Sequence, residues 1–119
     1  VVFIDFLQLI QADGKSEYDR VTTIATELQN IAKELKICIV ALSQVSNEGA
    51  KSDSVVISFK GSGALATACD VGIELSRAKE KNDGVQFDDI LVNIRKNRHG
   101  RRPSRTYDFD KNTGFILFC

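Results

Sequence analysis

Residues 1–10 read VVFIDFLQLI, an apolar run that carries one carboxylate, Asp5. Such a run predicts a buried strand that ends at Asp5 and is followed by a turn toward Gln8. A strand-end aspartate can cap the next turn. It can also hold Mg²⁺ beside nucleotide phosphates, because the strand fixes the carboxylate while its tip stays in water. The stretch alone leaves both interpretations open.

The following segment carries a helical repeat and then a second apolar run. Apolar residues recur at spacings of three and four and form one stripe, which consists of Val21, Ile24, Ala25, Leu28, Ile31, Ala32 and Leu35. We therefore expect a helix over residues 18–36 and a parallel buried strand over residues 37–42. This right-handed βαβ unit would bring Gln44 to the same sheet edge as Asp5.

The rest of the chain predicts a long loop and antiparallel strands. Residues 43–62 are irregular and polar, which is typical of a functional loop, and residues 64–69 suggest a helical turn. The expected strands are residues 71–76, 90–95, 105–109 and 115–118, with turns at 81–84 and 110–114. The predicted fold class is α/β, with a mostly parallel sheet and antiparallel C-terminal strands.

Composition and charge describe a globular chain with a local basic strip. With 119 residues, 43% hydrophobic and 27% charged, the chain is one globular domain or part of one. Its sixteen basic and sixteen acidic residues cancel, yet one strip of eleven residues, 95–105, carries basic residues and no acidic one. The strip contains Arg95, Lys96, Arg98, Arg101, Arg102 and Arg105. It is either a solvated hairpin face or a phosphate-binding surface.

Cysteine usage and hydropathy bear on location. The three cysteines are far apart and suggest neither a disulfide framework nor a zinc site. No apolar stretch is long enough to span a membrane and no secretory signal is present, so we expect a cytoplasmic protein without a membrane partner. Because the sequence lacks Met and begins inside a strand, we expect it to be the C-terminal part of a longer protein.

Three motifs occur in order along this pattern, DFLQL at 5–9, ALSQ at 41–44 and KNRHG at 96–100. Together they resemble the C-terminal motor domain of DnaB-type hexameric replicative DNA helicases, a RecA-like P-loop NTPase core. The resemblance covers nearly all of residues 1–119. It implies ATP hydrolysis coupled to translocation on single-stranded DNA and to duplex unwinding, with ATP and Mg²⁺ as cofactors. It also implies a homo-hexamer with ATP sites between subunits, and a primase or helicase loader as partner.

The resemblance gives four residues catalytic and nucleotide-binding roles. Asp5 would hold Mg²⁺, and Gln44 would sense the γ-phosphate. Lys96 and Arg98, which we expect to alternate on one strand, match the basic pair that reaches a neighbouring subunit's nucleotide. Phe6 stands where many ATPases carry a glutamate, so the general base would come from upstream.

The loop at residues 60–63 resembles the family's DNA-binding loop. Lys60 would supply charge, while Gly61 and Gly63 would allow close approach to DNA phosphates. The family usually has Arg-Glu-Ser-Gly where this chain has Lys-Gly-Ser-Gly, so a Gly-rich turn that caps a helix remains an alternative. Beyond the loop, Thr67 stands near the place of a family glutamine, and Asp70 matches a family aspartate.

One departure concerns activity. The sequence contains no G-x-x-x-x-G-K-[ST] phosphate-binding loop, so we expect the isolated chain to be inactive even if its parent protein is a helicase. Two rival hypotheses stay open. One is a RecA-like recombination or regulatory ATPase without unwinding. The other is a non-enzymatic module that contacts DNA or an oligomer, and whose DNA affinity does not depend on ATP.

Overall fold

The computed structural model describes residues 1–44, 63–77 and 87–117. The chain divides into two compact units, residues 1–69 and 70–119. The predicted turn at residues 81–84, the loop beyond Gln44, and the DNA-contact candidates Lys60 and Gly61 lie outside the described residues.

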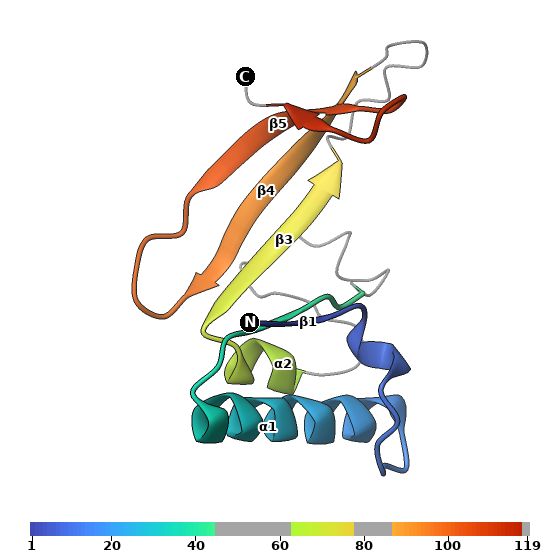
Figure 1. Ribbon diagram of the computed structural model, residues 1–119, viewed down its shortest axis with the longest axis vertical. Helices are drawn as coiled ribbons and strands as arrows, with labels where there is room; N and C mark the ends of the chain where they lie inside the picture. The colour runs from blue at the N-terminus through green and yellow to red at the C-terminus, as the bar shows by residue number, and fades with distance from the viewer. Residues whose placement is uncertain (45–62, 78–86, 118–119) are drawn as a thin grey trace. The chain divides into compact units, whose positions relative to one another are not determined.

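The first unit is the predicted βαβ arrangement. Strand β1 (Val2–Ile4) pairs in parallel with β2 (Ile39–Ala41), with Ile4 beside Ala41. The 3-10 helix η1 (Leu7–Leu9) and the helix α1 (Glu17–Leu35) lie between them in sequence. The short helix α2 (Gly63–Ala68) packs on α1, and both lie on the same side of β1 (Figure 1).

The ends of α1 are fixed by local chemistry. The Ser16 hydroxyl accepts a hydrogen bond from the Asp19 amide at 3.1 Å, which satisfies one free N–H of the first turn. At the other end Lys36 adopts a left-handed conformation, with φ 52, and its amide bonds the Ala32 carbonyl. The predicted helix is confirmed to within one residue at each end.

The core of the first unit lies between η1, α1 and α2. Its buried residues are Leu7, Val21, Ile24, Ala25 and Leu65. The apolar stripe is buried in the first half of α1 and exposed near its end, where Ile31 is 39% exposed and Leu35 is 61% exposed. The Gln29 side chain bonds the Ala68 carbonyl at the end of α2, so α2 does not continue to cover the last turns of α1.

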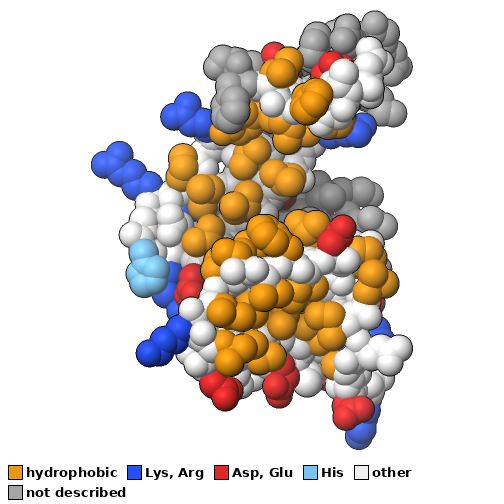
Figure 2. Space-filling model, in the orientation of Figure 1, with side chains coloured by type: hydrophobic (Ala, Val, Ile, Leu, Met, Phe, Trp, Pro, Cys, Tyr) orange, Lys and Arg blue, Asp and Glu red, His pale blue; other side chains and the backbone are white. Residues whose placement is uncertain are grey.

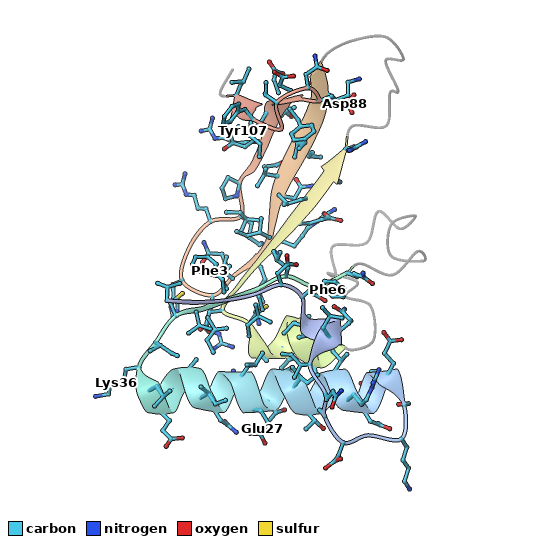
Figure 3. The ribbon with its side chains drawn as sticks, turned by 45° about the vertical axis from the view of Figure 1, so that its right-hand side comes forward. Phe3, Phe6, Glu27, Lys36, Asp88 and Tyr107 are labelled. Carbon is cyan, nitrogen blue, oxygen red and sulfur yellow. The ribbon has the colours of Figure 1, made fainter. Side chains whose placement is uncertain are left out.

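Strands β1 and β2 are more exposed to solvent than the sequence predicts. Ile4 packs against the core, whereas Phe3 is 76% exposed and points away from α1 (Figure 3). Because side chains alternate along a strand and the described helices of this unit lie on one face, Phe3 lies on the face that these helices do not cover. Val40 and Leu42 are exposed as well, and hydrophobic side chains are visible at the surface (Figure 2).

The second unit is a four-stranded antiparallel sheet in the order β3-β4-β5-β6. Its strands are β3 (Val71–Arg77), β4 (Phe87–Asn97), β5 (Ser104–Asp110) and β6 (Ile116–Leu117). The predicted strands are confirmed, and β4 is longer than expected. Within the described residues, parallel pairing joins β1 with β2, and the ladders of β3 to β6 are antiparallel.

The predicted turn at residues 110–114 is confirmed, and Asp110 organises it. Asp110 is 8% exposed, and its carboxylate accepts hydrogen bonds from the Asn112 amide at 2.9 Å and the Thr113 hydroxyl at 2.8 Å. Gly114 has φ +76, a conformation that favours glycine. In the described ranges, no helix is both long and apolar enough to cross a membrane.

The position of the core predicts that substitutions along α1 lower the free energy of unfolding by unequal amounts. Ile24→Ala should lower the free energy of unfolding by about 2 to 5 kcal/mol, because it leaves a cavity in a packed core. Ile31→Ala, on the same helix but 39% exposed, should cost clearly less. Urea denaturation of the purified variants measures both. Equal losses would contradict this description of the core.

Candidate functional site

Asp5 and Gln44 follow the carboxyl ends of two paired parallel strands. The pairing continues past the strands, since the Leu42 amide donates to the Ile4 carbonyl at 2.9 Å and the Leu7 amide donates to the Leu42 carbonyl at 2.9 Å. Both Asp5 and Gln44 are exposed. The structure therefore brings these two predicted site residues to one sheet edge, where ligands of open α/β folds bind.

The side chain of Gln8 joins the two strand ends. Its Nε2 donates to the Ser43 hydroxyl at 3.0 Å, and its Oε1 accepts a longer hydrogen bond from the Gln44 amide at 3.5 Å. The Ser43 hydroxyl lies 3.4 Å from the Gln44 carbonyl, to which it donates. Sequence reasoning did not assign Gln8 a role. The available signal was a polar residue in an apolar run just after Asp5.

Asp5 is the carboxylate at this edge. The Asp5–Phe6 peptide bond is cis. Across the described parts of the chain, no three His, Cys, Asp or Glu side chains gather as a metal-binding group. Asp5 offers an anionic carboxylate on a strand end, and Gln44 offers a neutral amide at the same sheet edge.

Lys96 and Arg98 lie in the second unit, and they do not share a strand. Lys96 lies in β4, opposite Gly72 of β3, whereas Arg98 lies in the turn after Asn97. The expectation that both alternate on one strand is wrong for Arg98. The reason is that β3 begins at Val71, whose partner is Asn97, so Arg98 lies beyond the ladder.

Arg98 makes two contacts with Asp70. Its Nη1 lies 2.7 Å from the Asp70 carboxylate, and its backbone amide donates to the Asp70 carbonyl at 2.9 Å. The two side chains remain 45% and 63% exposed. The contacts join the residue before β3 to the residue after β4, and they give the arginine a preferred place at the surface.

The basic strip is partly neutralised within the second unit. The Arg95 guanidinium pairs with Glu74, and Arg102 donates to the Arg95 carbonyl at 3.5 Å. His99 is exposed in a turn, and its backbone amide bonds the Asn97 side chain at 3.2 Å. With Arg95 and Arg98 both in ion pairs, the strip presents less free positive charge than its sequence suggests.

One residue of the predicted DNA-binding loop is described. Gly63 is the first residue of α2 and is exposed, and a Cβ added there would meet no atom within 4 Å. The fold itself therefore does not require glycine at this position. Thr67, near the place of the family's glutamine, donates its hydroxyl to the Gly63 carbonyl at 3.2 Å.

The parallel strand ends, with a carboxylate on one and an amide on the other, are those of an α/β protein, a class whose open sheets generally bind ligands at this edge. Comparison with known proteins gives the family. The family model for the DnaB-like helicase C terminal domain matches residues 1–116. This chain belongs to that family.

Individual relatives agree with this assignment. The Replicative DNA helicase DnaB of Treponema pallidum (strain Nichols) is 35% identical over 120 residues, which cover 99% of this chain and 26% of the relative. A solved DnaB-like replicative helicase, described with its interactions with primase, has a TM-score of 0.80 and 26% identity over 98% of this chain and 30% of that one. A second solved structure, described as an ATPase domain, has a TM-score of 0.81 and 25% identity, over 98% of this chain and 43% of that one. The fold is RecA-like, and the chain spans about a quarter of the length of its T. pallidum relative.

The exposure of the Arg98–Asp70 pair predicts a small role in stability. Asp70→Asn removes the ion pair and keeps the backbone contact, so it should change the free energy of unfolding by less than about 1 kcal/mol. The difference from the unsubstituted protein should shrink further at high salt. Urea denaturation at low and high salt measures this. A large, salt-independent loss would mean that the pair holds the fold together.

Proposed function

We propose that this chain is part of the ATP-driven motor of a replicative DNA helicase, an enzyme that couples ATP hydrolysis to movement along single-stranded DNA and to duplex unwinding. The observation that carries the proposal is the pairing of the Asp5 and Gln44 strand ends in a chain of this family. The relatives support it by their names, since they are replicative helicases and an ATPase domain. Residues 1–119 would be the C-terminal part of the RecA-like domain.

The Asp5 edge fits Mg²⁺ and a nucleotide triphosphate. Mg²⁺ is commonly held by one or two carboxylates, with phosphate oxygens and water as the other ligands, so a single exposed Asp5 is a suitable protein ligand. The metal ion would neutralise charge on the phosphates of bound ATP. Gln44 would contact the γ-phosphate through its neutral side-chain amide, much as a glutamine orients water in other phosphate hydrolases.

Lys96 and Arg98 would act on the nucleotide of a neighbouring subunit. The exposure of Arg98 supports this role, because a guanidinium that reaches another subunit has to lie at the surface. We propose a homo-hexamer in which each ATP site lies between subunits, with Asp5 and Gln44 on one side and Lys96 and Arg98 on the other. Catalysis would then depend on assembly, and the isolated chain would be inactive.

The partners that we propose for this motor are single-stranded DNA and a primase or helicase loader. Single-stranded DNA would be contacted through Lys60, Gly61 and Gly63, with phosphates rather than bases as the target. A primase or a helicase loader is proposed as a protein partner, and the relative described with primase supports the former. The motor would act in the cytoplasm, without a membrane partner.

A subunit-mixing experiment tests the shared site. In the full-length protein, Asp5→Ala and Arg98→Ala should each abolish ATP turnover, the latter by about 10³ to 10⁵ in rate. Hexamers mixed from the two variants should regain part of the activity, because some interfaces then carry both intact residues. Arg105→Ala, another exposed arginine, is the matched control and should turn over ATP normally. Mixtures without recovery would contradict a shared site.

DNA binding separates the motor from a non-enzymatic module. Lys60→Ala should weaken single-stranded DNA binding to a similar degree for different sequences and reduce the salt slope by about one, because a phosphate contact is lost. Lys33→Ala, an exposed lysine of α1, serves as control. Fluorescence anisotropy with and without ATP measures both. Affinity that ignores ATP and survives Asp5→Ala would support the non-enzymatic module instead.

A further inference from the structure

We propose that Gln8 is a positioning residue that sets Gln44 in place relative to Asp5. It would thereby couple the metal-binding end of β1 to the phosphate-sensing end of β2. The inference rests on the proposed function, and it assigns a role to a side chain that the motor proposal does not use.

The first observation is the reach of the Gln8 side chain. Gln8 lies in η1, directly after the Asp5 turn, and its Nε2 donates to the Ser43 hydroxyl at 3.0 Å across a sequence separation of 35 residues. Its Oε1 accepts from the Gln44 amide at 3.5 Å. One half-buried amide group thus bonds two consecutive residues at the end of β2.

The donors and acceptors in this cluster agree with one another. A serine hydroxyl has a single hydrogen, and Ser43 donates it to the Gln44 carbonyl at 3.4 Å. The hydroxyl must then accept from the Gln8 NH₂ group, which leaves the Gln8 oxygen to accept from the Gln44 amide. A flipped Gln8 would place its NH₂ group against another N–H. The N–H and C=O of Gln44 are therefore both held, one by Gln8 and one by Ser43.

Gln8 is itself anchored. Its neighbour Leu7 is 3% exposed in the core, and the Leu7 amide bonds the Leu42 carbonyl at 2.9 Å. The turn is closed further by the Ile10 amide, which bonds the Leu7 carbonyl at 3.1 Å. A shift of η1, which follows Asp5, would consequently be transmitted through Gln8 to the backbone of Gln44.

The expected consequence is kinetic. Loss of the Gln8 contacts would let Gln44 move, and a misplacement of about 1 Å can cost about 10²-fold in rate. Gln8 makes no proposed contact with ATP, so ATP binding should change little. A positioning role therefore predicts a lower kcat with a nearly constant KM for ATP.

The experiment uses the full-length protein and four variants. Gln8→Met keeps the length of the side chain and removes its hydrogen bonds, while Ser43→Ala removes the second contact. The double variant completes a thermodynamic cycle, and Gln11→Met, at an exposed position nearby, is the matched control. The measurements are kcat and KM of DNA-stimulated ATP hydrolysis, hexamer assembly by sedimentation, and the thermal unfolding midpoint.

We expect Gln8→Met to lower kcat by about 10 to 10²-fold with KM, assembly and midpoint unchanged. Ser43→Ala should lower kcat less, and the double variant should lose less than the product of the two single rate factors, because Gln8 and Ser43 contact each other and both hold the backbone of Gln44. Gln11→Met should behave as the unsubstituted protein.

Several results would overturn the inference. If the unsubstituted protein is active and Gln8→Met keeps its kcat, or if the rate factors of the two single variants multiply, Gln8 does not position Gln44. A raised KM for ATP at constant kcat in Gln8→Met would also mean that Gln8 does not position Gln44. If the Gln8→Met protein does not assemble into hexamers, an unchanged kcat in Ser43→Ala would overturn the inference instead. An unsubstituted protein that hydrolyses no ATP would overturn the proposed function and this inference together.

Discussion

The structure of the candidate site depends on the hydrogen bonds that continue the β1–β2 pairing beyond both strands. A two-stranded sheet has little stability of its own, so its ends have to be held by packing. Ile4 packs against the core and Leu7 is buried in it, and both share backbone bonds with Leu42. Asp5 lies between these two anchored residues. Asp5 is exposed to solvent, and the backbone on both sides of it is held in place.

Local signals in the sequence were sufficient for most of the fold. The apolar repeat of α1 and the turn residues at 110–114 act over a few positions, and the helix and the turn predicted from them are confirmed. The common edge of Asp5 and Gln44 was also predictable. It follows from one general rule, because two parallel strands joined by a helix must end at the same side of their sheet.

Other features depend on contacts between distant residues, and the sequence could not supply them. Leu35 is 61% exposed, and α2 ends where Gln29 of α1 bonds Ala68, which apolar periodicity in α1 does not report. The bond from Gln8 to Ser43 requires that a 3-10 turn and a strand end meet, and nothing in either segment encodes the other's position. For Arg98 the decisive fact is where the partner strand begins, which sets the end of the ladder.

The pair between Arg98 and Asp70 is compatible with a role for this arginine on a neighbouring nucleotide, and magnitudes decide the point. An exposed pair of this kind contributes about 1 kcal/mol or less, whereas a rate effect of about 10³ to 10⁵ corresponds to about 4 to 7 kcal/mol of transition-state stabilisation. In the proposed role, exchange of Asp70 for the phosphate would therefore be favourable at the transition state. Before that exchange, Asp70 limits the positions that a long side chain samples, which reduces the entropy lost when the arginine reaches its target. The same weak contact that contributes little to folding can in this way prepare Arg98 for the proposed interface.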